Sequence, residues 1–156
     1  MKKLVTLKML KSCLKKLKKR GKRIVFTNGC FDILHFGHVA YLKKCKALGD
    51  ILVVGLNSDS SVKKIKGRTR PVNRQIERGA VLSALEFVDY VVMFTEKTPE
   101  NLIRAISPSI LAKGGDWRKK DIVGNCFVQK SGGKTVVIPY VKGFSTTRIL
   151  ERLKHA

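Results

Sequence analysis

The 156-residue chain is poor in acidic residues: 11 Asp and Glu stand against 33 Lys and Arg, a formal net charge of +22. It is also poor in cysteine, and its four cysteines form no CxxC pair, which argues against a zinc knuckle or a disulfide framework. No apolar run approaches the length of a membrane span, and lysines interrupt the N-terminal segment where a signal peptide needs an apolar stretch. These absences predict a cytoplasmic protein with reduced thiols and no membrane association.

Aromatic residues are also few, at 7% of the chain. The excess of positive charge raises the alternative of a basic module that binds nucleic acid or an anionic membrane surface. However, the basic residues are spread along the chain with one dense run at 15–23, and the single Trp and three Tyr are not interleaved with Arg in a stacking platform. We therefore predict no nucleic-acid partner and expect a smaller anion as ligand.

The length fits a single domain over residues 1–156, with an N-terminal helix within 1–21 packed on it. Leucines recur at helical spacing between lysines, so residues 6–20 are predicted to form an amphipathic helix that Thr6 caps and Gly21 ends. These leucines are Leu4, Leu7, Leu10, Leu14 and Leu17. A membrane-surface helix is the alternative, but the narrow apolar face without Trp or Phe favours docking on the domain.

Short β-branched runs then alternate with helical patterns. The predicted strands are Ile24–Thr27, Ile51–Leu56, Asp89–Phe94, Ile110–Lys113 and Thr135–Ile138. The predicted helices are 36–48, 73–87, 98–106 and 145–154. This alternation predicts an α/β fold with a Rossmann-like, doubly wound, five-stranded parallel sheet. In such sheets ligands bind beyond the carboxyl ends of the strands, and the polar segments of this chain follow its strands.

Two histidines, His35 and His38, stand one helical turn apart directly after the first strand. A histidine-ligated metal needs further ligands, and the remaining histidine is His155 at the far end, so we predict no metal site built by side chains. The start of a helix instead favours an anion, because free backbone N–H groups and the helix dipole lie there. Gly37 between the histidines lets the backbone approach a phosphate closely.

Two sequence signatures now indicate a family. His35 to His38, HFGH, matches the HxGH signature of the nucleotidyltransferase superfamily, and FSTTR at 144–148 resembles its second signature, of the ISTT[KR] type, with Phe144 in place of a smaller residue. Over residues 4–153 the chain resembles the adenylyltransferase domain of bacterial heptose 1-phosphate enzymes. The matching stretches are FTNGCFDILHFGH, VVGLNSD, the KG..RPVN loop, VDYVV and LAKGGDW. Some members carry a preceding sugar kinase domain, and this chain resembles the stand-alone form.

The resemblance implies transfer of AMP from ATP to D-glycero-D-manno-heptose 1-phosphate, giving ADP-heptose and pyrophosphate for lipopolysaccharide core synthesis. It implies small-molecule partners only, Mg²⁺ carried by the nucleotide phosphates, and the homodimer that related enzymes suggest. The alternative within the superfamily is a cytidylyltransferase acting on glycerol 3-phosphate or another small phosphate, since it shares both signatures.

The resemblance also assigns roles to residues. Catalytic residues are expected to be His35, His38, Ser145 and Thr146. Nucleotide-binding residues are expected to be Thr27, Asn28, Gly29, Gly37, Arg78, Gly115, Asp116 and Thr147. Asp32 and Lys66 are expected on the sugar-phosphate side, with Lys66 in a mobile loop that closes over an anion. Arg78 has a simpler alternative role as a surface ion-pair residue. The alternative for Lys113 and Trp117 of the LAKGGDW stretch is to line the site without contacting a substrate.

Overall fold

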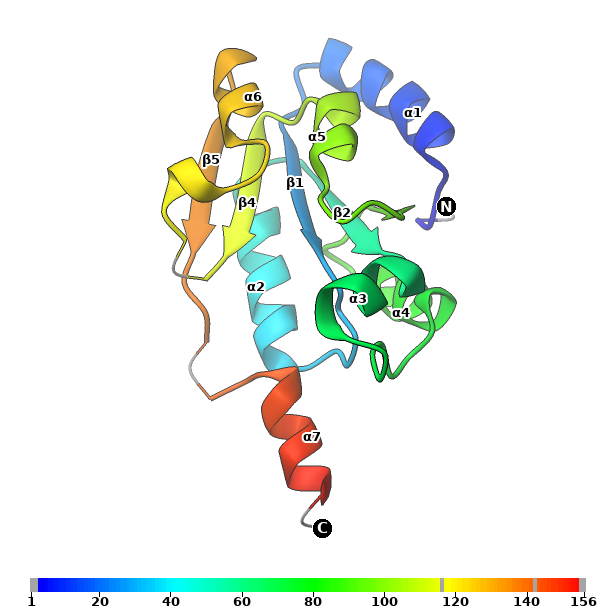
Figure 1. The fold of residues 1–156 in the computed structure, drawn as a ribbon. Helices are drawn as coiled ribbons and strands as arrows, with labels where there is room; N and C mark the ends of the chain where they lie inside the picture. The colour runs from blue at the N-terminus through cyan, green and yellow to red at the C-terminus, as the bar shows by residue number, and fades with distance from the viewer. Residues whose placement is uncertain (1–2, 116, 142, 155–156) are drawn as a thin grey trace.

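The computed structural model describes residues 3–115, 117–141 and 143–154, and its centre is a five-stranded parallel sheet (Figure 1). The strands are β1 (Ile24–Gly29), β2 (Ile51–Asn57), β3 (Tyr90–Phe94), β4 (Ile110–Gly114) and β5 (Lys134–Ile138). They lie in the order β3-β2-β1-β4-β5, all parallel. The chain order reverses at β1, between β2 and β4, which is where a doubly wound sheet opens a crevice for a ligand. The predicted fold class is confirmed.

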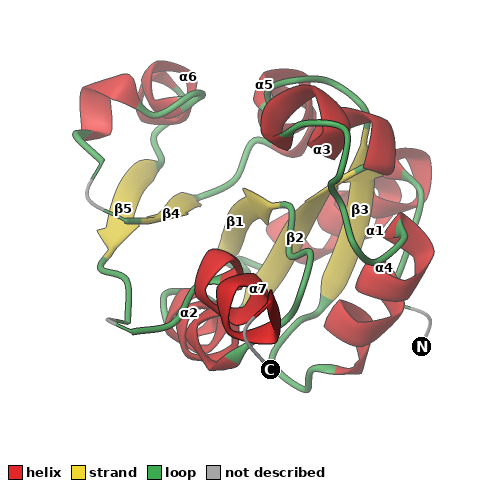
Figure 2. Ribbon diagram, turned by 60° about the horizontal axis from the view of Figure 1, so that its bottom comes forward, coloured by secondary structure: helices red, strands yellow, loops and turns green. Residues whose placement is uncertain are grey.

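Helices cover both faces of this sheet (Figure 2). The helices are α1 (Leu7–Lys19), α2 (Phe36–Lys46), α3 (Asp59–Lys66), α4 (Gln75–Ala84), α5 (Glu100–Ile106), α6 (Asn125–Lys130) and α7 (Thr146–Lys154), with a 3-10 turn at Lys119–Asp121. One core cluster lies under α1, α5 and α6, and the other lies under α2 and α4. The apolar run of β2 and the apolar first half of β1 are buried between these two layers, as central parallel strands require.

The N-terminal helix α1 packs along β3 and α5. Leu10 and Leu14 are buried in the core cluster that they share with α5 and α6. Thr6 caps the helix by accepting a hydrogen bond from the backbone N–H of Met9. The leucine stripe is therefore satisfied by the domain itself. None of the described helices has both the length and the apolar character needed to span a bilayer.

The structure adds two helices that hydrophobic periodicity did not predict. α3 is short and polar, and it begins because the Ser58 side chain accepts a hydrogen bond from the backbone N–H of Ser61. α6 has six residues and follows its N-cap residue Gly124, whose φ of 86° and close approach to Ile103 leave no room for a side chain. Elements of this length carry too few residues for a periodic signal, so capping and packing define them instead.

Candidate active site

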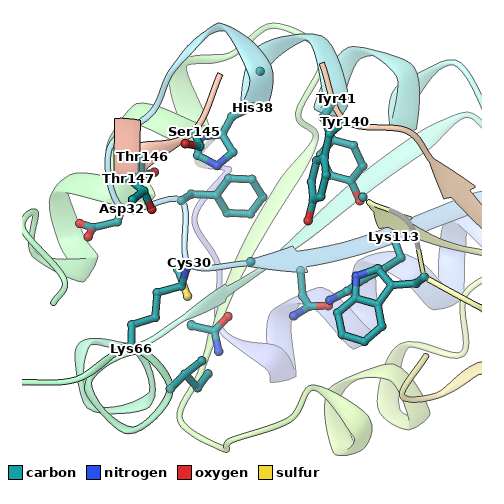
Figure 3. Close-up of a pocket in the computed structure, with 18 of the residues that line it drawn as sticks. Cys30, Asp32, His38, Tyr41, Lys66, Lys113, Tyr140, Ser145, Thr146 and Thr147 are labelled. Carbon is teal, nitrogen blue, oxygen red and sulfur yellow. The ribbon is translucent and has the colours of Figure 1, made fainter. Parts of the chain in front are cut away.

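The carboxyl ends of the strands open into a cavity of about 920 Å³. Its wall comes from the segments that follow all five strands, including 97–99 after β3. The predicted site residues that line it are Asn28, Gly29, Asp32, His35, Gly37, His38, Lys66, Ser145, Thr146 and Thr147. Figure 3 draws the labelled His38 and Ser145 on one side of the cavity in this view and Lys113 on the opposite side.

The two histidines form a stacked pair at the start of α2. His35 is the N-cap residue, and its carbonyl accepts hydrogen bonds from the backbone N–H groups of His38 and Val39. The two rings lie 3.8 Å apart between centroids with an interplanar angle of 22°. The Nδ1 atoms of both rings are buried and have no hydrogen-bond partner among the described residues. A buried polar atom without a partner is costly, so this pair is suited to a polar ligand.

Both imidazoles are held in the neutral form. Burial is the largest cause that lowers the pKa of His38, to about 4. Burial also lowers the pKa of His35. At neutral pH each ring therefore keeps one N–H donor without carrying a charge of its own. Neutral donors at a helix N-terminus can bind phosphate oxygens and stabilise charge that develops on them.

The turn before the histidines is shaped by Phe31. This residue has a φ of 45°, which is uncommon for a residue other than glycine. Its buried ring meets the His38 ring edge-on, with 5.2 Å between centroids. Gly29 lies beneath the same ring, and a Cβ there would come within 2.9 Å of it. The strained turn therefore packs one face of His38 before any ligand binds.

An aromatic contact joins the segment of the second signature to that of the first. Ser145 caps α7 by accepting a hydrogen bond from the backbone N–H of Arg148, which confirms the predicted cap. Phe144 packs on Phe36 with 4.9 Å between ring centroids. At Gly37 a Cβ would lie 3.1 Å from the Cβ of Phe144. The glycine inside the first signature therefore makes room for the second, while α7 extends away from the body (Figure 1).

Asp32 and Arg78 lie in surroundings that the sequence did not predict. The Asp32 carboxylate is nearly buried, and in Figure 3 it points away from His38, at the edge of the cavity. It accepts hydrogen bonds from the Nε of Arg70 and from the backbone N–H groups of Val72 and Asn73. Arg78 is not among the described residues that line the cavity, and it is 2% exposed. Its guanidinium bonds to Asp59 and to two backbone carbonyls, so it is not the exposed ion-pair residue of the simpler alternative, and its role in nucleotide binding stays a prediction.

Two further predicted residues lie at or behind the wall, and a third is not among the described residues. Thr27 is fully buried, and its hydroxyl shares a hydrogen bond of 2.7 Å with Tyr41. Gly115 has a φ of 112° and is covered by the ring of Tyr140, which a Cβ would approach to 2.7 Å. Asp116 lies outside the described residues. Both tyrosines line the cavity (Figure 3), and neither was predicted from the sequence.

A signal for Tyr41 was available, since it stands three residues after His38 on the same helix face. Tyr140 follows β5 in an exposed segment that carries no recognisable motif.

The cavity wall carries more positive than negative charge. The basic lining residues are His35 and His38 in neutral form together with Lys66, Arg70, Lys97, Lys113 and Arg148. Its acidic lining residues among those described are Asp32 and Asp121, and each is already paired with an arginine. Burial lowers the pKa of Lys113, whose Nζ lies 5.9 Å from the Trp117 ring centre. This charge balance suits a ligand with several phosphate groups.

Two other chemistries find no support among the described residues. The described residues contain no group of three or more His, Cys, Asp or Glu side chains arranged to hold a metal ion. Cys30 lines the cavity, but burial raises the pKa of its thiol, so the nucleophilic thiolate is disfavoured.

Comparisons with known proteins place this geometry in context. The family described as cytidylyltransferase-like matches residues 26–152. The bifunctional protein HldE of a Nitratiruptor species is 56% identical over 140 residues, which cover 90% of this chain and 29% of that protein. The bifunctional protein HldE of Geotalea uraniireducens is 49% identical over 152 residues, covering 97% of this chain and 31% of that protein. The chain thus spans about three tenths of the length of these curated relatives.

Solved structures show the same architecture. The lipopolysaccharide core biosynthesis protein from Thermoplasma volcanium superposes with a TM-score of 0.65 at 29% identity, over 80% of this chain and 100% of that one. A pantoate-beta-alanine ligase from Francisella tularensis superposes with a TM-score of 0.60 at 17% identity, over 97% of this chain and 76% of that one. At that identity the second likeness concerns the fold alone.

Proposed function

Because the chain belongs to the cytidylyltransferase-like family, we propose that it is a nucleotidyltransferase that moves AMP from ATP to D-glycero-D-manno-heptose 1-phosphate. The products are ADP-heptose and pyrophosphate. The observation that carries the proposal is the stacked pair of neutral imidazoles, with unpartnered Nδ1 atoms, at the start of α2. The choice of heptose is supported by the LAKGGDW stretch and by similarity to a protein named for lipopolysaccharide core biosynthesis.

The proposed reaction is a direct in-line displacement. An oxygen of the sugar 1-phosphate attacks the α-phosphorus of ATP, the bond from that phosphorus to the bridging oxygen breaks, and pyrophosphate leaves with the bond's electron pair. The attacking oxygen is already anionic, so no enzyme base has to remove a proton. The protein's contribution is to align the two phosphates and to stabilise the charge of the transition state.

Each part of the wall has a place in this proposal. His35 and His38 donate hydrogen bonds to the oxygens that gain charge, and a donor of this kind contributes about 3 kcal/mol to transition-state binding. Ser145 and Thr146 offer hydroxyls and the N-terminal amides of α7 to the departing phosphates. Lys66 lies on the side that we assign to the acceptor phosphate.

We propose that Mg²⁺ enters the site bound to the nucleotide phosphates. Both carboxylates of the described wall, Asp32 and Asp121, are already paired with arginines, so the residues present do not form a cage for the ion. Its ligands would be the phosphates and water, and it would supply neutralisation of phosphate charge. A homodimer and a cytoplasmic location stay predictions.

Cytidylyl transfer to a small phosphate is the second candidate, favoured by the description of the matching family. Both candidates are tested together by incubating the protein with each nucleoside triphosphate and with either heptose 1-phosphate or glycerol 3-phosphate, and measuring pyrophosphate. We expect release with ATP and the heptose phosphate. Release with CTP and glycerol 3-phosphate alone would replace our substrate assignment by the second candidate.

A further inference from the structure

Asp32 connects the first signature to a loop about forty residues further along the chain. Its Oδ1 accepts hydrogen bonds from the backbone N–H groups of Val72 and Asn73, at 2.7 and 3.1 Å. Its Oδ2 accepts from the Nε of Arg70, and its carbonyl accepts from the side-chain amide of Asn73. Both carboxylate oxygens are therefore occupied by the turn at 70–73.

Arg78 also connects the same two segments through hydrogen bonds. Its guanidinium donates to the carbonyl of Cys30, beside Asp32, and to the carbonyl of Asn73, in the turn. Its third bond goes to the Asp59 carboxylate at 2.8 Å. Arg78 is 2% exposed, so these are buried, charge-assisted bonds of the stronger kind. The signature loop and the 70–73 turn thus form one hydrogen-bonded unit.

Two cations of the cavity wall, Lys66 and Arg70, lie in or next to this unit along the chain. Lys66 is the last residue of α3, and after Gly67 the chain leads directly into the 70–73 turn. Arg70 is the ion-pair partner of Asp32, and it lines the cavity together with Lys66. Residues 63–69 are exposed, so beyond the last turn of α3 this stretch is restrained mainly by the hydrogen bonds of the 70–73 turn.

We propose that Asp32 is a positioning residue that holds Lys66 and Arg70 toward the acceptor phosphate, and is not itself a ligand of the sugar. This inference rests on the proposed function, because it assigns the acceptor phosphate to these two cations. A carboxylate whose two oxygens already accept three N–H donors has little capacity left for sugar hydroxyls. As an anion, it would also repel a phosphate that approached it directly.

The test is a double-mutant cycle on Asp32→Asn and Arg70→Gln. Asparagine keeps an oxygen for the two backbone donors but turns an amide toward Arg70, so the ion pair is lost. We expect Asp32→Asn to raise the KM for heptose 1-phosphate about 10-fold with kcat within about 3-fold. Each single variant already breaks the Asp32–Arg70 contact, so the rise in KM of the double variant should be smaller than the product of the two single effects.

A second readout follows the loop without any substrate. We expect limited trypsin digestion to cleave after the exposed Lys66 and Arg68, and Asp32→Asn and Arg70→Gln each to speed this cleavage about 10-fold. The matched control is Glu100→Gln, which breaks the exposed Glu100–Arg104 pair on α5 and should change neither readout. Circular dichroism would establish that each variant is folded, and Arg70→Gln alone tests the contact if Asp32→Asn does not fold.

The outcomes separate this inference from the proposed function. Unchanged cleavage in both variants, or KM effects that multiply in the double variant, would overturn the positioning role. Failure of the unaltered protein to release pyrophosphate from any substrate pair would overturn the proposed function, while the digestion would still test the contact between Asp32 and the turn.

Discussion

The two signature sides of the cavity are held in place by different forces. On the first side, His38 is packed by the buried ring of Phe31, and the preceding loop is fastened through Asp32 to the 70–73 turn. On the other side, α7 is brought to the site by contact between Phe144 and Phe36, whose side chains are 48% and 58% exposed. The histidines are therefore preorganised by the core, whereas the hydroxyls of α7 depend on an exposed apolar contact.

This difference suggests that the two sides of the cavity act on different phosphates of the substrates. Fixed donors cost no reorganisation when charge develops, so the rigid side suits the reacting α-phosphate. A segment held by an exposed contact can adjust to a ligand, so the α7 side suits the phosphates that arrive and leave. Substitutions on the two sides should accordingly affect different kinetic constants.

The largest effect is expected on the rigid side. His35→Ala or His38→Ala removes one transition-state donor, and we expect kcat to fall about 100-fold or more with little change in KM for ATP. The measurement is steady-state pyrophosphate release, with thermal unfolding as the check on the fold. Full activity in either variant would remove the histidines from the mechanism.

A smaller effect is expected on the α7 side. Phe144→Ala removes the ring that contacts Phe36, and we expect the KM for ATP to rise about 10-fold while kcat changes less. The matched control is Phe144→Leu, which keeps apolar contact and is expected to retain most of the affinity. If Phe144→Ala instead lowered kcat as strongly as the loss of a histidine, the proposed division between the two sides would be wrong.

The smallest effect concerns pH and separates the sides again, because only the first side carries histidines. The folded protein holds His38 at a pKa of about 4, below its ordinary value of 6.5, and we expect the negative charge of a bound phosphate to raise this pKa. Proton uptake then accompanies binding, and ATP affinity should rise about 3-fold between pH 7.5 and pH 6. Calorimetry in two buffers with different ionisation enthalpies would measure this uptake. His38→Ala should abolish most of it.

The same shift predicts how stability depends on pH without ligand. As the pH falls below 6.5, the unfolded chain gains a proton that folded His38 resists until about pH 4. The unfolded state therefore binds more protons across this window, and the free energy of unfolding should decrease as pH falls through it. Denaturant unfolding of the native protein and of His38→Ala would show whether the decrease belongs to this side chain.

The sequence predicted the sheet and much of the cavity wall, because both depend on local patterns. The apolar run of β2 and the HFGH motif after β1 could be read directly. The position of Arg78 could not, since its partners Cys30 and Asp59 lie 48 and 19 residues away and follow only from packing. Tyr140 was missed for the same reason, because its ring covers Gly115 on a neighbouring strand end.

The central claim, direct transfer without a covalent enzyme intermediate, is tested most directly by pyrophosphate exchange. Labelled pyrophosphate is incubated with ATP and the protein, with and without heptose 1-phosphate. Direct attack of the sugar phosphate predicts that label enters ATP only when the sugar phosphate is present. Exchange of label in its absence would show an adenylylated enzyme, and would contradict the mechanism built on His35 and His38.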